Sequence, residues 1–304
     1  MKTKYIVTLS ILLVIALFQF SCKKEHIHED EEITTTDKDK TVAEENSMAQ
    51  SEFEDIFDYV DEEASGTGSN LRTDGKDTTF KKTGIKDYGC VDSVIYEKKT
   101  VDSVIIRTIT FIFNGSTYCK NGVSRKGKII AVMKGLYKEI NNSVTVTFDN
   151  FYMKRPKMTY WIHVEGTKTI KTVEYKTDSI AGRKVNVTVK DARLTWPDLT
   201  YTLWQSDHTN LITVSKEPKL KIVNMWGGES GISRKGKNYK VTIDESTPCV
   251  KRSDCKWIVS GRMNIVRSDS IKIKSRILDY GNGNCDSLAT VILASGDTLQ
   301  VILK

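Results

Sequence analysis

The sequence has little that points to catalysis. Histidine occurs only four times in 304 residues, and there is no Gly-x-Ser-x-Gly motif, no His-Glu-x-x-His motif and no activated-cysteine signature. No Cys-x-x-Cys motif and no histidine at ligand spacing lies near the cysteines, which argues against zinc. We therefore expect no metal and no cofactor, and we expect binding rather than enzymatic activity.

Long apolar runs are scarce, and the most prominent one lies at the N-terminus. It extends from Tyr5 to Phe20, follows two lysines and ends at Ser21-Cys22. Such a run is too short to span a bilayer comfortably, and a small residue before a cysteine is typical of a lipoprotein signal. We expect residues 1–21 to be removed and Cys22 to be acylated, for example with palmitate, so that the protein is tethered to a membrane. A plain secretory signal or an N-terminal membrane anchor is the alternative.

Basic residues are scarce in residues 22–66, whereas they outnumber acidic residues in the rest of the chain. Residues 22–66 carry 4 Lys against 16 Asp and Glu, a net charge of −12, whereas residues 67–304 carry a net charge of +17. A basic body attracts polyanions such as acidic polysaccharide or lipopolysaccharide. An exported protein meets little nucleic acid, so we expect no nucleic-acid partner. The alternative is that the lysines only solvate sheet faces.

The acidic region, residues 22–75, offers little apolar surface. Its first part, residues 23–47, predicts a disordered tether. One short helix is expected near residues 51–63, where Ser51 and Glu54 form a capping-box pattern. Its apolar residues recur with helical spacing and are Phe53, Ile56, Phe57 and Val60. A helix of this length is marginal alone, so this stripe should dock on the body or on a protein partner.

From residue 76 onward, apolar and polar residues alternate in short runs rich in Thr, Val, Ile and Lys, separated by Asn-Gly-type breaks. This pattern predicts an all-β body. A heptad at residues 122–128, Gly-Val-Ser-Arg-Lys-Gly-Lys, returns as Gly-Ile-Ser-Arg-Lys-Gly-Lys at residues 231–237. The repeat favours two tandem antiparallel β-sandwich-like modules, residues 76–176 and 177–304.

The heptad matches the front of a phosphate-binding loop, but that function is excluded. Ile129 and Asn238 stand where a hydroxyl would bind Mg²⁺, and a strand rather than a helix follows each copy. We expect two hairpin turns in which Gly127 and Gly236 adopt positive φ. Their basic tips are candidate anion-binding sites, with Arg125, Lys126, Lys128, Arg234, Lys235 and Lys237 as the residues.

Five cysteines remain once Cys22 is acylated, and an exported protein can form disulfides. The spacings of 29 and 30 positions favour the pairs Cys90–Cys119 and Cys255–Cys285, with Cys249 unpaired.

Two tryptophans, Trp196 and Trp226, lie in loop-like sequence and are candidates for stacking on a sugar ring. A glycoside hydrolase needs only two carboxylates within reach of one bond. The candidates for that role are Asp149, Glu165, Asp191, Asp198 and Asp207.

Several segments together resemble a family of uncharacterised outer-membrane lipoproteins from Bacteroidetes. They lie at residues 53–63, 125–129, 147–152, 165–167, 194–198, 255–261 and 278–286. The resemblance implies a lipid anchor in the outer membrane, with the cell surface favoured and the periplasmic face as the alternative, and brings no known activity. It also implies O-glycosylation at Asp-Ser or Asp-Thr motifs, whose hydroxyl residues are Ser93, Ser103, Ser179, Ser270, Ser287, Thr78 and Thr298.

The leading hypothesis is a non-catalytic, lipid-anchored envelope protein whose basic β-sheet body binds acidic glycans. A secreted glycan hydrolase with paired carboxylates is the first alternative. A structural or assembly lipoprotein that binds a protein partner through the Phe53–Val60 helix is the second.

Overall fold

The computed structural model describes residues 26–66, 78–83, 89–135, 137, 139–176, 182–215, 220–267 and 275–303. The expected signal peptide and Cys22 lie outside these residues. The chain separates into two units, Met1–Thr41 and Val42–Lys304. The first unit, described from His26, consists of the beginning of helix α2 (His26–Gly66). The second contains the rest of α2 and every described strand.

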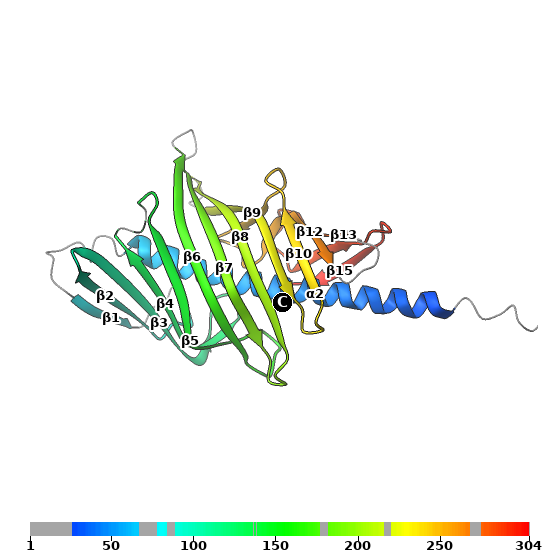
Figure 1. Ribbon diagram of the computed structural model, residues 1–304, viewed down its shortest axis with the longest axis horizontal. Helices are drawn as coiled ribbons and strands as arrows, with labels where there is room; N and C mark the ends of the chain where they lie inside the picture. The colour runs from blue at the N-terminus through cyan, green and yellow to red at the C-terminus, as the bar shows by residue number, and fades with distance from the viewer. Residues whose placement is uncertain are drawn as a thin grey trace, which may run out of the picture. The chain divides into compact units, whose positions relative to one another are not determined.

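The described strands form a single antiparallel sheet (Figure 1). They are β1 (Thr78–Thr83), β2 (Ser93–Val101), β3 (Val104–Tyr118), β4 (Ser124–Lys134), β5 (Ser143–Lys154), β6 (Ile162–Lys176), β7 (Gly182–Thr195), β8 (Tyr201–Val214), β9 (Lys221–Ile232), β10 (Asn238–Ile243), β11 (Cys249–Arg252), β12 (Ile258–Arg267), β13 (Ser275–Asn282), β14 (Leu288–Ile292) and β15 (Thr298–Ile302). The all-β prediction is confirmed. The alternation of β-branched and polar residues that predicted it gives each strand one buried and one exposed face.

Strand order follows the chain almost throughout. Each strand from β1 to β10 pairs with the next, and the order then continues through β12, β13, β14 and β15, while β11 pairs with both β9 and β12. The expected boundary near Thr177 does not divide the sheet, because β6 and β7 pair from His163↔Thr195 to Lys176↔Gly182. The division into two modules, residues 76–176 and 177–304, therefore stays a prediction, and the two stretches share one continuous sheet. Hydrogen bonds between two long strands join the halves directly.

Helix α2 is much longer than the sequence predicted. The acidic segment expected to be a disordered tether is helical from His26, and the predicted helix at residues 51–63 lies within α2. From Val42 to Gly66 the helix lies against one face of the sheet, which we call the inner face; the opposite face is the outer face (Figure 1). The apolar stripe is buried there, with Phe53, Ile56 and Val60 fully enclosed. The helix thus docks on the body of its own chain.

Aromatic packing fixes α2 on the inner face. The ring of Phe53 stacks on Trp204 of β8 at 5.3 Å between centroids and meets the edge of Phe148 of β5 at 5.7 Å. Tyr59, two turns on, lies 6.1 Å from the Phe111 ring of β3. Such contacts add to the burial of apolar surface, which is the main stabilising contribution to the fold.

The two copies of the basic heptad occupy different structures. In the first copy, Gly127 (φ +98°) lies within β4 opposite a bulge of β5 at Asn150 and Phe151, and a Cβ atom on Gly127 would come within 2.0 Å of the Asn150 carbonyl oxygen. In the second copy, Gly236 (φ +70°) lies in the turn between β9 and β10, with nothing within 4 Å. The expectation of two equivalent hairpin turns therefore holds only for the second copy. Both glycines have positive φ, a conformation that favours glycine over other residues.

Candidate functional site

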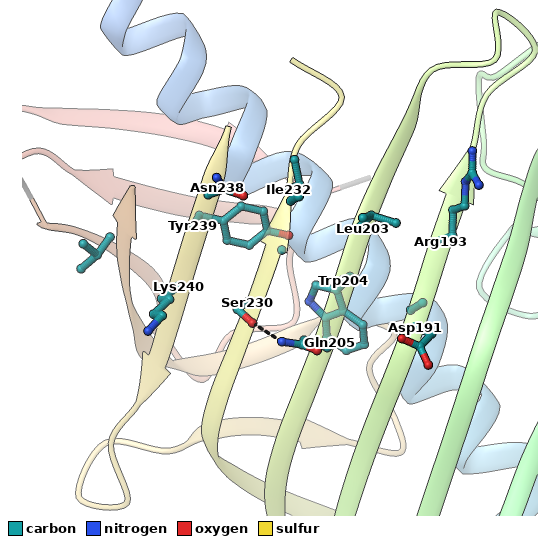
Figure 2. A pocket seen from close by; sticks show the side chains of 13 residues that line it. Asp191, Arg193, Leu203, Trp204, Gln205, Ser230, Ile232, Asn238, Tyr239 and Lys240 are labelled. Carbon is teal, nitrogen blue, oxygen red and sulfur yellow. Dashed lines mark hydrogen bonds between the residues drawn. The ribbon is translucent and has the colours of Figure 1, made fainter. Parts of the chain in front are cut away.

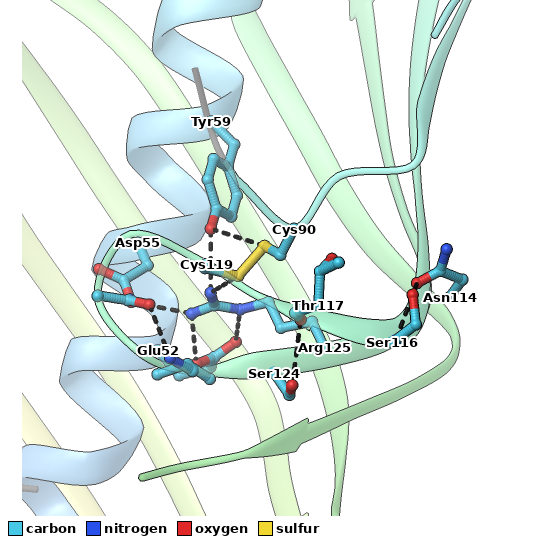
Figure 3. The surroundings of a disulfide bond; sticks show 12 residues. Glu52, Asp55, Tyr59, Cys90, Asn114, Ser116, Thr117, Cys119, Ser124 and Arg125 are labelled. Carbon is cyan, nitrogen blue, oxygen red and sulfur yellow. Dashed lines mark hydrogen bonds and ion pairs between the residues drawn. A yellow bond between two sulfur atoms is a disulfide. The ribbon is translucent and has the colours of Figure 1, made fainter. Parts of the chain in front are cut away.

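The acidic side chains of α2 meet basic side chains of the inner face. Arg125 of β4 is fully buried and binds Glu52 through two hydrogen bonds of 2.8 Å, with Asp55 at 2.9 Å (Figure 3). Burial disfavours the charged guanidinium, but the neighbouring carboxylates outweigh burial and raise the pKa of Arg125. The same guanidinium donates to the Tyr59 hydroxyl at 3.0 Å and to Cys119 Sγ at 2.9 Å.

Further ion pairs continue this pattern along the helix. Lys168 of β6 donates to the Phe53 carbonyl at 2.5 Å and lies 3.8 Å from Glu54, while Arg183 of β7 pairs with Asp61. Because Lys168 is fully buried, desolvation lowers its pKa to about 8.

Asp58 lies between two lysines, with Lys221 Nζ at 2.7 Å and Lys251 Nζ at 3.0 Å. Burial opposes ionisation of this carboxyl, but the two lysines outweigh burial and lower its pKa to about 2. Part of the negative charge of the acidic segment is therefore neutralised within the protein, by basic side chains of the strands that α2 covers.

This internal pairing changes the expected anion-binding set. Arg125 does not lie at an exposed tip, because strand alternation turns it inward to the acidic helix. Its neighbour Lys126 points to the outer face. Lys128 is exposed and pairs with Asp149 at 2.9 Å.

The second basic heptad lies at a turn, but its arginine is engaged. Arg234 contacts Asp198 at 2.8 Å and the Thr200 hydroxyl at 2.7 Å, and its guanidinium lies 4.4 Å from the centroid of the Trp196 ring. Lys235 is exposed. Trp196 itself is only 5% exposed, so it is not free to stack on a sugar as expected.

Lys237, from the predicted anion-binding set, and Trp226, from the predicted sugar-stacking pair, are both half-buried. Lys237 follows Gly236 in the turn. Trp226 lies on β9 and packs against the hydrophobic core.

The outer face carries a cluster of rings and cations, which we call the aromatic–lysine platform: Lys126, Tyr152, Lys154, Trp161 and His163. Lys126 Nζ lies 4.6 Å from the Tyr152 ring centroid and 4.8 Å from that of Trp161. Lys154 Nζ lies 5.0 Å from the Trp161 ring, and His163 packs on Tyr152 at 4.7 Å. The platform combines apolar ring faces with ammonium groups in cation–π contact.

Sequence reasoning missed all of the platform except Lys126. The signal that could have found it is period-two alternation, which places Tyr152 and Lys154 of β5 on one face, beside Trp161 and His163 at the start of β6. Lys126, Tyr152 and His163 are neighbours because of the register in which three strands pair. This register cannot be deduced from the sequence of the individual strands.

A trough lies beside the platform on the outer face of β7–β10 (Figure 2). One lobe has a volume of about 510 Å³ and a second lobe about 430 Å³, and the lobes share Gln205, Ser230 and Lys240. The Gln205 amide donates to the Ser230 hydroxyl at 2.8 Å. Arg193, on the rim of the first lobe, stacks over the exposed Tyr201 ring at 4.1 Å.

The five candidate carboxylates are spread over the described sheet. Asp149 and Asp198 are paired with Lys128 and Arg234, respectively. Glu165 lies 3.7 Å from His163 at the platform. Asp191 lines the first lobe of the trough, whereas Asp207 lines the second.

The structure contains both disulfide bonds that the cysteine spacing favours, Cys90–Cys119 and Cys255–Cys285. Cys249 is unpaired and buried, and desolvation raises the pKa of its thiol well above the usual range.

The candidate O-glycosylation residues differ in accessibility. Ser93 is fully buried, so its hydroxyl is closed to a modifying enzyme in the folded protein. Ser103 and Thr298 are exposed, and Ser287 is half-buried. Ser179, Ser270 and the side chain of Thr78 lie outside the described residues.

In the part of the chain that the structure describes, no group of three or more His, Cys, Asp or Glu side chains is arranged to hold a metal ion. The one described helix lacks an apolar stretch long enough to cross a membrane. Comparison of the chain with family models, curated proteins and solved structures yields no match.

Proposed function

We propose that this chain is a non-catalytic, lipid-anchored protein of the bacterial outer membrane that binds acidic glycans through the outer face of its sheet. The anchor is Cys22, on the strength of the signal sequence, and the orientation is toward the cell surface. The observation that carries the binding function is the aromatic–lysine platform, with Lys126 between the rings of Tyr152 and Trp161.

The platform matches the chemistry of an acidic sugar. Aromatic faces pack against the C–H groups of a sugar ring, and ammonium groups form charge-assisted hydrogen bonds with a carboxylate, sulfate or phosphate. Lys126 and Lys154 are half-buried beside the rings. Among the described residues, no carboxylate forms an ion pair with either lysine, unlike Arg125, which two carboxylates neutralise.

Binding is tested with the full chain against polygalacturonate, hyaluronan, lipopolysaccharide and neutral dextran, each at low and high salt. The double variant Lys126→Ala/Lys154→Ala is compared with the control Lys99→Ala/Lys134→Ala, which removes the same charge at exposed positions without rings. We expect acidic polymers to bind more weakly at high salt, because mobile ions screen surface charges. We expect the platform variant to lose about tenfold in affinity and the control little. Equal losses in both double variants would overturn the platform as the site.

The hydrolase alternative finds less support in the geometry. Two of its five carboxylates are held by cations, and Asp191 and Asp207 line different lobes of the trough. The assembly alternative relied on the apolar stripe of the helix, and that stripe is buried against the inner face.

A further inference from the structure

The trough owes its depth to small residues on the outer face of β9. The floor of the trough is formed by three alternate residues of β9 that face outward. They are Ile232, Ser230 and Gly228, and their side chains decrease in size in that order. At Ser230 and Gly228 the neighbouring strands carry longer side chains at the paired positions, whereas Ile232 is as large as its partners. The rows across β8, β9 and β10 are Leu203–Ile232–Asn238, Gln205–Ser230–Lys240 and Asp207–Gly228–Thr242. A furrow therefore follows β9 between two walls (Figure 2).

The chemistry of the furrow changes along its length. At one end, Leu203, Ile232 and Val266 present half-buried apolar surface. In the middle, the Gln205 amide and the Lys240 ammonium are exposed on opposite walls. Apolar floor and hydrogen-bonding walls suit a chain whose units have both C–H faces and hydroxyl groups.

Register links the furrow to the platform. His163 pairs with Thr195, and in the next outward row Glu165 pairs with Arg193, which pairs with Leu203 at the rim of the furrow. From β5, which carries Tyr152, to β9, which carries the furrow, is four strand spacings, or about 19 Å across the strands at ~4.8 Å each.

We propose that the furrow binds the continuation of the same glycan, so that an acidic unit lies on the platform while neighbouring uncharged units lie along β9. This inference rests on the proposed function and specifies its ligand as a polymer with alternating acidic and neutral sugars. Affinity then depends on chain length, because only an oligosaccharide that spans at least about 19 Å reaches both sites.

The test fills the furrow and measures affinity against chain length. The variants are Ser230→Trp and, independently, Gly228→Trp, whose backbone has no positive φ and whose added Cβ would meet only the Val241 carbonyl at 3.7 Å. The control is Thr145→Trp, an exposed position on β5 away from the furrow. Circular dichroism and the urea midpoint establish that each variant is folded. The probes are hyaluronan oligosaccharides of defined length, in which acidic and neutral units alternate, titrated calorimetrically into the full chain.

For the natural sequence we expect affinity to rise about tenfold once the oligosaccharide exceeds the span. Both furrow variants should lose that gain and keep the affinity of the short oligosaccharides, whereas Thr145→Trp should retain both. Binding that is unchanged by both furrow variants at every length, yet abolished by Lys126→Ala/Lys154→Ala, would overturn the furrow and leave the platform standing. Absence of binding by any acidic polymer would overturn the proposed function as well.

Discussion

Replacing Arg125 with methionine tests whether the acidic helix is held by charge pairing with the sheet. The substitution keeps much of the side-chain volume but leaves Glu52, which is fully buried, without its two hydrogen bonds. Removing one partner of a buried ion pair typically costs about 3–5 kcal/mol, because the other charge remains desolvated. Such a loss should lower the urea midpoint by roughly 1–2 M.

The assay is urea unfolding of the full chain at pH 7, followed by tryptophan fluorescence. The double variant Arg125→Met/Glu52→Leu removes both charges and should be more stable than Arg125→Met alone, since no uncompensated carboxylate remains at that position. Arg125→Lys keeps the charge without the bidentate geometry and should be intermediate. It also keeps the comparison possible if Arg125→Met fails to fold.

The matched control is Lys128→Met, which breaks the exposed pair with Asp149. Exposed ion pairs contribute about 0–1 kcal/mol, so this variant should unfold close to the natural sequence. The reasoning is refuted if Arg125→Met also stays within about 1 kcal/mol of the natural sequence, or if adding Glu52→Leu brings no recovery.

Three further predictions concern the inner face and the basic heptad. The pKa of Lys168 is about 8 in the fold, against 10.5 as reference, so the unfolded chain binds more protons between these values and stability should rise with pH from 8 to 9.5; Lys168→Met should flatten that rise in urea midpoints. The pKa of Asp58, about 2 against 3.8, contributes stability that is present above pH 4 and lost as pH falls toward 2, and Asp58→Asn should lose less in acid titrations followed by circular dichroism. Gly127→Ala should destabilise by several kcal/mol through the clash with the Asn150 carbonyl, whereas Gly236→Ala should cost about 1–2 kcal/mol from its positive φ alone, as thermal unfolding would measure; equal costs would contradict the different structures of the two copies.

The strands, the disulfide pairs and the docking part of the helix could be predicted from the sequence, because each depends on residues that are close together or regularly spaced in the chain. Alternation of β-branched and polar residues predicted the strands, and cysteine spacing favoured both disulfide bonds. The helical spacing of Phe53, Ile56, Phe57 and Val60 located the part of α2 that docks on the sheet.

The errors share a physical cause, which is that their determinants are distant in the sequence. The acidic segment was predicted to be a solvated tether because the basic side chains that pair with it are far away in the sequence. Arg125, for example, lies 73 positions beyond its partner Glu52. The repeated heptad predicted two equivalent turns, but strand pairing places Gly127 opposite a bulge of β5 and Gly236 in a turn. The platform depends on the register of three strands, so of its residues only Lys126 was predicted.

Because α2 covers the inner face of the sheet, the body should be studied with the helix present. Residues 67–304 without the helix would expose the apolar inner face and the basic residues that α2 covers, among them Arg125 and Lys168. A basic fragment of that kind would bind polyanions through the inner face. Binding should therefore be measured with the helix present.

The most direct measurement of the central claim is the salt dependence of polygalacturonate binding by the full chain and by Lys126→Ala/Lys154→Ala. If the outer platform is the anion site, the natural sequence should bind with a steep decline as salt increases, and the double variant should bind weakly with a shallower decline. Identical affinities and identical salt dependence in the two proteins would contradict the account.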